Sequence, residues 1–258
     1  MDYWNMIIVQ PMLNSLLAIY SVLGLNFGLA IIVFTAIIRL ITHPLTAQQQ
    51  RSAQRMQEMQ KSKEWQDIQK KYKGDRDKLA QEQMRLYKEL GVNPFGSCLP
   101  TLIQFPIIIG LYQSIMHALA NTPQQLLDIS RFIYPFFPDA AKLIPLDPHF
   151  LWMNLGEPER VYVLGFGVPV LALLVMVTTY MQSKVMTPMS ADPNDQSAQM
   201  TKMMNIYMPL MLGFFAYQFA AGLALYFVAS NVFSIVQYSM LGKTDWRRLL
   251  PSFSGGRK

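Results

Sequence analysis

The chain has 258 residues, of which 52% are apolar and 15% are charged, and its formal net charge is +6. Several stretches of roughly 17–25 residues carry almost no charge, which is the length that an α-helix needs to cross a bilayer. This distribution predicts an all-α polytopic membrane protein, and it leaves no reason to read the basic pI near 9.3 as nucleic-acid binding. The single cysteine, Cys98, excludes an internal disulfide and a multi-cysteine metal site.

The N-terminal segment, residues 1–20, mixes Trp and Tyr with apolar residues and contains Pro11. We expect it to form an amphipathic helix in the extracytoplasmic membrane interface. An N-terminal extension of the first membrane span is the alternative. Because the segment contains no Lys or Arg, we expect no cleavable signal peptide.

The first span is predicted at about residues 22–41, closed by His43 and Pro44, and it contains Arg39. Arg39 lies five residues before Pro44, so its long side chain could extend to the cytoplasmic interface with no further role. The alternative is a charge that serves a polar site inside the membrane. This segment by itself does not separate the two readings.

A cytoplasmic helical hairpin is predicted over residues 46–92. Thr46–Tyr72 reads as one helix, Lys73–Asp75 as a turn and Arg76–Leu90 as a second helix, each helix with a short apolar stripe. The simplest interpretation is a solvated loop. The more specific interpretation is a docking arm for ribosomal RNA or anionic lipid. Its docking surface would consist of the basic residues Arg51, Arg55, Lys70, Lys71, Lys73, Arg76 and Lys78.

Four further spans are predicted in the rest of a core that covers residues 21–242. Two lie at about 98–120 and 161–181, with an outer loop at 121–160 between them. The apolar block 203–241 is nearly twice the length of one span, so it must be two helices, 203–217 and 222–241. The turn between them is expected in the sequence YQFAAG, Tyr217–Gly222.

The distribution of Lys and Arg orients these five spans. Residues 46–97 hold eleven Lys or Arg, whereas residues 121–160 hold three together with five acids. A basic tail, 243–258, follows the last span and holds five more. Both basic segments predict an extracytoplasmic N-terminus and a cytoplasmic C-terminus.

The predicted spans contain no Asp or Glu, which disfavours ion-coupled transporters. No H-E-x-x-H sequence and no Gly-rich phosphate loop is present, so we expect no enzyme, no metal and no cofactor. Arginine cannot lose its charge in a protein, and no acid is at hand to pair with Arg39. A hydrophilic cavity open to the cytoplasm is the remaining solution, although single polar residues in other spans also serve to join helices.

Three stretches then resemble the YidC/Oxa/Alb family of membrane protein insertases. They are FTAIIRLITHPLTAQQ, LYKELGVNPFGSCLPTLIQFPIIIGLYQSI and MNIYMPLMLGFFAYQFAAGLALYFVASNVFSIVQ, in a core from about Asn26 to Leu241. The resemblance implies a five-helix core, a cytoplasmic hairpin and an arginine-containing groove. The groove would be lined by Arg39, Thr35, Gln104, Tyr226, Ser230 and Asn231, and an apolar slide by Phe105, Pro106, Ile109, Met208 and Met211.

The function that follows is insertion of nascent membrane proteins into the bacterial plasma membrane. A polar or acidic tail would pass through the positive groove while the apolar helix slides into lipid, without nucleotide hydrolysis. The resemblance implies the ribosome, the Sec translocon and the signal-recognition-particle receptor as partners. The alternatives are an uncoupled small-anion channel or carrier with Arg39 as selector, and a purely structural assembly factor.

Overall fold

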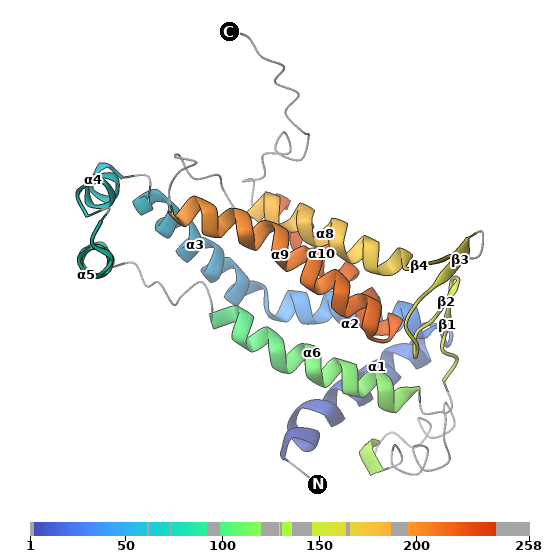
Figure 1. The fold of residues 1–258 in the computed structure, drawn as a ribbon. Coiled ribbons are helices and arrows are strands. Elements are labelled where there is room, and N and C mark those ends of the chain that lie inside the picture. The colour runs from blue at the N-terminus through green and yellow to red at the C-terminus, as the bar shows by residue number, and fades with distance from the viewer. Residues whose placement is uncertain are drawn as a thin grey trace. The chain divides into compact units, whose positions relative to one another are not determined.

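The structure is a computed structural model, and it describes residues 3–60, 62–72, 74–91, 99–119, 129, 131–135, 146–163, 166–186 and 196–240 (Figure 1). The described chain is mostly helical, as predicted, although it also contains two short β-hairpins that the all-α class did not include. It divides into two compact units, residues 1–41, 105–185 and 205–258 in the first, and 42–104 and 186–204 in the second. Lys73, the basic tail and residues 121–128, 130 and 136–145 of the predicted outer loop lie outside the described residues.

The first unit begins with a continuous helix of 18 residues, formed by η1 (Asn5–Val9) and α1 (Gln10–Val22). Leu13, Leu16 and Leu17 are fully buried in its inner face. The chain then turns through Gly24 and Leu25, which both have positive φ, before α2 (Phe27–Ile41). This turn shows that the alternative of one helix running into the first span is wrong.

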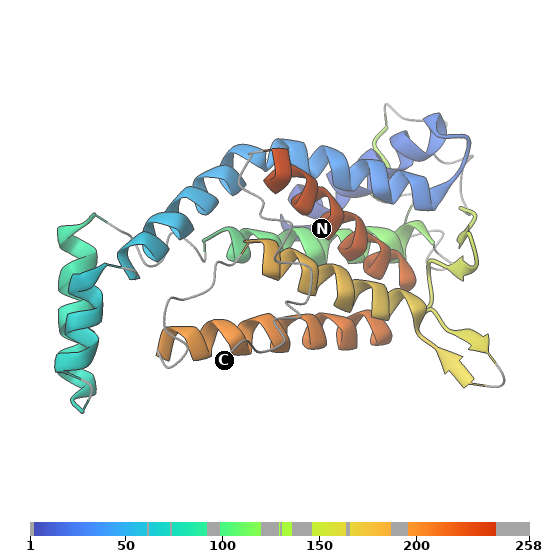
Figure 2. The ribbon, with the colours of Figure 1, turned by 90° about the horizontal axis from the view of Figure 1, so that it is seen from above.

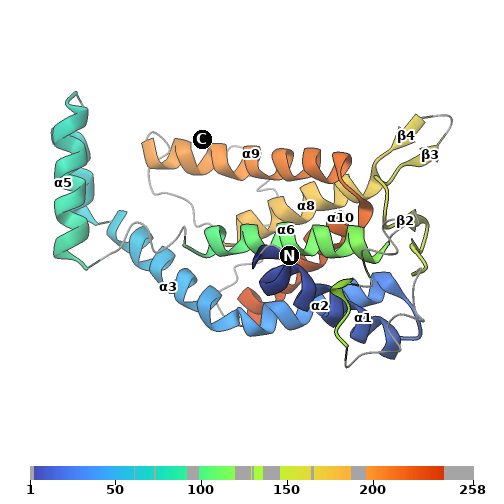
Figure 3. The same ribbon diagram turned by 90° about the horizontal axis from the view of Figure 1, so that it is seen from below.

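The other helices of this unit are the part of α6 (Leu99–Ala118) from Phe105, α8 (Val170–Met186) to Val185, the part of α9 (Gln196–Gln218) from Asn205, and α10 (Ala221–Met240). α10 is the most enclosed of them, with thirteen buried residues. Figures 2 and 3 show α10 between α2 and α8, with α9 on the far side of α8. The turn from α9 to α10 is Phe219–Ala220, inside the predicted YQFAAG sequence.

Two described helices, Asn5–Val22 and Ala221–Met240, are long and apolar enough to cross a membrane. A third is reached if α2 and the helix that follows it are counted as one bent span, and Val170–Val185 is a shorter apolar helix. The five-span topology and the interfacial position of residues 1–20 therefore stay predictions.

The third span, predicted at residues 161–181, begins later in the structure than expected. Two strands, β3 (Val161–Val163) and β4 (Phe166–Val168), pair antiparallel there, with Tyr162 opposite Gly167. β-branched and aromatic residues favour strands, and Pro169 is suited to the start of a helix because it lacks an N–H. The helix α8 accordingly begins only at Val170.

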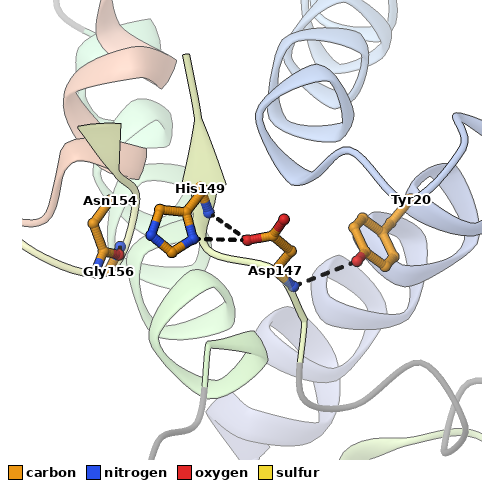
Figure 4. Close-up of polar contacts among 5 residues, drawn as sticks. All are labelled: Tyr20, Asp147, His149, Asn154 and Gly156. Atoms are coloured by element: carbon orange, nitrogen blue, oxygen red, sulfur yellow. Dashed lines mark hydrogen bonds and ion pairs between the residues drawn. The ribbon is translucent and has the colours of Figure 1, made fainter. Parts of the chain in front are cut away.

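A second short hairpin, β1 (His149–Phe150) and β2 (Met153–Asn154), precedes it and fastens residues 146–160 to α1 and α2. Phe150 packs on Gly28 so closely that a Cβ there would lie 2.1 Å from the ring. The backbone N–H of Asp147 donates to the Tyr20 hydroxyl at 3.4 Å (Figure 4). The segment is thereby held at the end of the bundle where α2 begins.

The same segment caps the N-termini of α8 and α10, whose first N–H groups have no partner inside their own helices. The carbonyls of Leu155 and Glu157 accept from Gly222 and Ala221 at 2.9 and 2.8 Å. The buried carboxylate of Glu159 accepts from the backbone N–H of Leu171 at 3.0 Å. A negative charge at this position also interacts favourably with the helix dipole.

The second unit contains α3 (His43–Gln60), α4 (Lys63–Lys71) and α5 (Arg76–Glu89). The predicted single helix Thr46–Tyr72 is wrong, because α3 ends at Gln60 and α4 begins at Lys63. The Ser62 side chain caps α4 by accepting from Trp65 N–H at 3.3 Å. Serine is preferred at helix N-caps rather than inside helices, because its side chain forms hydrogen bonds with the backbone. α4 and α5 pack on each other around a small core of Met59, Trp65 and Leu86.

Candidate functional site

Arg39 lies in the last turn of α2, and its side chain extends to α10. Its Nε donates to the hydroxyl oxygen of Ser230 at 3.0 Å, and one terminal nitrogen also contacts that oxygen. Ser230 is buried in α10. The guanidinium therefore contacts α10. A side chain that only extended to the cytoplasmic interface would not make this contact.

Gln237 is a second contact between these helices, and the sequence analysis missed it. Its side-chain Nε2 donates to the backbone carbonyl of Arg39 at 3.1 Å. Carbonyls in the last turn of a helix are the ones that lack helical partners, so this amide stabilises the end of α2. A signal was available, because Ser230, Ser234 and Gln237 recur at i, i+4 and i+7 and so share one helix face.

Thr35 and Tyr226 lie in the buried interior of the same unit, one helical turn before Arg39 and Ser230 respectively. The Thr35 hydroxyl donates to the carbonyl of Ile31 at 2.6 Å, within its own helix. Tyr226 is almost fully buried and packs with Phe227, their ring centroids 5.7 Å apart. Both residues thus belong to the packed surroundings of Arg39.

Asn231 bonds to a different helix from Ser230. Its Nδ2 donates to Thr178 Oγ1 at 3.1 Å and to Thr179 Oγ1 at 2.8 Å, which joins α10 to α8. One turn further along α8, the Ser183 hydroxyl contacts the Asn205 side-chain oxygen on α9. A chain of polar contacts therefore links α2, α10, α8 and α9.

Gln104 falls in the second unit, so the structure does not place it relative to Arg39. Gln113, another polar residue of α6, accepts a hydrogen bond from Trp4 Nε1 at 2.7 Å. It therefore joins α6 to the N-terminal helix. The next residue, Ser114, is buried and donates to the carbonyl of Gly110 at 2.7 Å.

The residues expected to form an apolar slide lie on outward faces of α6 and α9. Phe105 and Ile109 are exposed on α6, Met208 and Met211 are exposed on α9, and Pro106 is half-buried. Exposed apolar side chains in such numbers indicate contact with lipid or with another apolar segment.

The basic residues of the second unit are largely exposed, as a docking surface requires. Arg51, Arg55 and Lys70 are exposed on α3 and α4. Lys71 lies over the ring of Tyr72, and Lys78 forms an ion pair with Asp75 at 3.3 Å. Of Arg76 only the backbone is described, in the first turn of α5.

The comparison with known families gives the chain its identity. The sequence model of the family described as 60Kd inner membrane protein matches residues 18–246. The chain belongs to this family. Two relatives from it are the membrane protein insertase YidC of Oceanobacillus iheyensis, 34% identical over 247 residues, and the membrane protein insertase MisCA of Bacillus subtilis, 34% identical over 261 residues.

Coverage differs among these members of the 60Kd inner membrane protein family. The matches span 93% and 99% of this chain, and 84% and 86% of the Oceanobacillus and Bacillus proteins. The YidC of Syntrophobacter fumaroxidans is matched over only 38% of its length. A solved structure, an active YidC insertase with its first transmembrane domain resolved, aligns with 92% of this chain and 46% of its own, with a TM-score of 0.59 and 24% identity, which shows the fold alone.

Proposed function

We propose that this protein is a membrane protein insertase of the bacterial plasma membrane, acting on nascent membrane proteins. Family membership and the names of the relatives support this proposal. The observation that carries the mechanism is the contact of Arg39 with buried Ser230, among described helices of the first unit that contain no Asp or Glu. A fixed positive charge at this position suits an acidic ligand.

The first step is capture of a polar or acidic tail of the nascent chain in a hydrated groove. A guanidinium has five N–H donors in a fork that matches a carboxylate, and a bond between two charged groups is about twice as strong as a neutral one. Arg39 thereby lowers the cost of taking the tail out of water. In this proposal Thr35, Gln104, Tyr226, Ser230 and Asn231 complete the groove, and Thr35 and Tyr226, which are buried in the structure, meet water only when the groove opens.

The second step is movement of the apolar part of the substrate into lipid. It slides along Phe105, Pro106, Ile109, Met208 and Met211, whose side chains are exposed or half-buried. Burial of an apolar helix of roughly 20 residues supplies the free energy, so no nucleotide is hydrolysed. In the same proposal the N-terminus is extracytoplasmic, the hairpin α4–α5 docks the ribosome, and the Sec translocon and the signal-recognition-particle receptor are partners.

Site-specific photocrosslinking tests the proposed function. A photoreactive residue at Phe105 should capture a ribosome-bound nascent membrane protein. A matched probe at Leu173, which is also exposed and apolar but lies on α8 outside the proposed slide, should label mainly lipid. Equal labelling of lipid alone at both positions would contradict the insertase function.

The role of the charge is tested separately with Arg39→Ala and Arg39→Lys. We expect Arg39→Ala to slow insertion of an acid-tailed single-span substrate by about tenfold, the loss of one charge-assisted bond, and to affect a neutral-tailed substrate far less. Arg39→Lys should retain most activity if charge matters more than the fork. Full-rate insertion by Arg39→Ala would remove the electrostatic step, and anion flux through purified protein would favour a channel.

A further inference from the structure

A cavity of about 550 Å³ lies at the end of the first unit that carries the two β-hairpins. The side chains that give it its chemistry come from the β1–β2 hairpin, from the segment that follows it and from β3: Trp152, Asn154, Glu157, Glu159, Arg160 and Tyr162. None of these residues enters the proposed insertion mechanism. The cavity therefore has no role in that mechanism.

One of the two acids in the cavity is already used by the fold. Buried Glu159 accepts from Trp152 Nε1 at 3.0 Å and from the backbone N–H of Leu171 at 3.0 Å. These bonds fix the indole of Trp152 while leaving 55% of the residue exposed. Glu159 is thus a structural acceptor, and Trp152 is a fixed wall of the cavity.

The other two charges in the cavity are exposed and opposite in sign. Neither Glu157 nor Arg160 forms an ion pair with any residue that the structure describes. The Arg160 guanidinium lies 5.3 Å from the centroid of the Tyr217 ring on α9. The cavity therefore presents an anion, a cation and two exposed aromatic walls, Trp152 and Tyr162.

The position of the cavity brings these charges to the edge of an apolar surface. The strands β3 and β4 lead directly into α8 (Figure 2), whose exposed Leu173 and Leu174 lie within its first five residues. Phe214 and Phe215 are exposed near the end of α9, close in sequence to Tyr217. Tyr and Trp at the boundary between polar and apolar surface are typical of the level of lipid headgroups.

We propose that this cavity binds the headgroup of a zwitterionic phospholipid of the phosphatidylethanolamine class. Arg160 binds the phosphate, and Glu157 binds the ammonium group, which the faces of Trp152 and Tyr162 also attract. The acyl chains lie along the exposed apolar side chains of α8 and α9. An anionic lipid would leave Glu157 without a partner, and a basic peptide would be repelled by Arg160.

Fluorescence of Trp152 in the full chain tests this proposal. Trp4, Trp65 and Trp246 are replaced by Phe, and the protein is placed in nanodiscs of phosphatidylglycerol. Phosphatidylethanolamine with brominated acyl chains is then added in rising proportion, against brominated phosphatidylglycerol in a parallel series. We expect half-maximal quenching at an about tenfold lower fraction of the zwitterionic lipid.

Variants assign the two charges. Glu157→Gln should abolish the preference between the lipids, whereas Arg160→Gln should weaken quenching by both. The matched control Arg131→Gln, which removes an exposed charge that does not line the cavity, should change neither curve. Lipid retained in native mass spectrometry, measured on the chain with all four Trp intact, provides a second readout.

Three results would overturn the proposal. One is identical quenching by the two lipids, and another is the same preference in Glu157→Gln as in the parent. The third is a change of Trp152 emission that a lysine-rich peptide causes and the lipid does not, which would assign the cavity to a basic peptide.

Discussion

At the scale of single residues, Gly110 allows two helices of the first unit to pack closely. A Cβ on Gly110 of α6 would lie 2.4 Å from Ile8 Cγ2 and 3.0 Å from Met12 Sδ. Ile8 is β-branched, so its Cγ2 has little freedom to move away. Small residues at such interfaces let backbones approach, which is the main source of helix association in lipid. Gly110 thus holds the N-terminal helix against α6.

We expect Gly110→Ala to destabilise the protein by about 1–3 kcal/mol, the usual cost of overpacking. Adding Ile8→Ala should recover part of this loss, because it removes the clashing methyl group. Thermal unfolding of the two single variants and the double variant measures the coupling. Gly74→Ala is the matched control, since nothing lies within 4 Å of a Cβ there. Strictly additive effects would show that Ile8 is not the obstacle.

The pKa of Asp147 is lowered because the backbone N–H of His149 donates to its carboxylate, and the His149 ring adds a second hydrogen bond. Figure 4 shows both contacts. A lowered pKa means that ionised Asp147 stabilises the fold above its ordinary pKa of 3.8 and that this stability is lost as the pH falls through the lowered value. The contact is therefore intact at neutral pH.

Asp147→Asn should accordingly lower the Tm at neutral pH, and the difference from the parent should shrink as the solution becomes acid. Tm measured over a pH series checks this expectation. A difference that stays constant down to pH values below the ordinary pKa would mean that the charge of Asp147 contributes nothing.

At the scale of elements, α4 and α5 form a helix pair, in which each helix has its own N-cap and the two share a small core. Asp75 caps α5 by accepting from Lys78 N–H at 3.1 Å, as Ser62 caps α4. Trp65 is 2% exposed and lies 5.9 Å from the Tyr87 ring. Burial raises the pKa of Tyr87. The two helices therefore depend on one aromatic contact more than on their ion pairs, which are exposed and of little worth.

Replacing Trp65 by Ala should cost about 3–5 kcal/mol in this core and remove hydrogen-exchange protection from α4 and α5. The pKa of Tyr87 should fall toward its ordinary value, because the ring becomes hydrated. Glu64→Ala, an exposed neighbour, is the control. If α2 and α10 lost protection to the same extent, the two helices would not be a separate cooperative unit.

At the scale of the whole chain, polar contacts of two kinds run through the membrane core. Arg39 with Ser230 brings a charge into the bundle, whereas Asn231 with Thr178 and Thr179 joins neutral groups of α10 and α8. Hydrogen bonds between membrane helices are worth about 0.6 to 1.7 kcal/mol. In the proposed groove the first contact supplies the charge, and the second fixes Asn231 to α8.

Asn231→Leu should therefore lower stability by about 1 kcal/mol and reduce insertion of acid-tailed and neutral-tailed substrates alike. Ser230→Ala should also lower stability by about 1 kcal/mol, because the Arg39 guanidinium loses its acceptor, but it should in addition alter the ratio between the two substrates. Insertion assays with both substrates, combined with unfolding measurements, separate these roles. A change of that ratio in Asn231→Leu would show that Asn231, too, distinguishes acidic tails from neutral ones.

The sequence by itself determined the features that depend on local pattern. The helical membrane class follows from runs of apolar residues, the α9–α10 turn from an apolar block too long for one span, and the turn before Arg76 from Gly74 between two helical stretches. Arg39 was visible as the charge in an apolar helix. These are properties of neighbouring residues, and no packing is needed to read them.

Only the tertiary structure decided how distant segments meet. It gave Arg39 its contacts with Ser230 and Gln237, 191 and 198 residues away. It also turned residues 161–168 into a hairpin and gathered Glu157, Arg160 and Trp152 around one cavity. An apolar run of that length fits a strand as well as a helix until its neighbours are known, and the partner of a buried charge is set by which helix faces pack together.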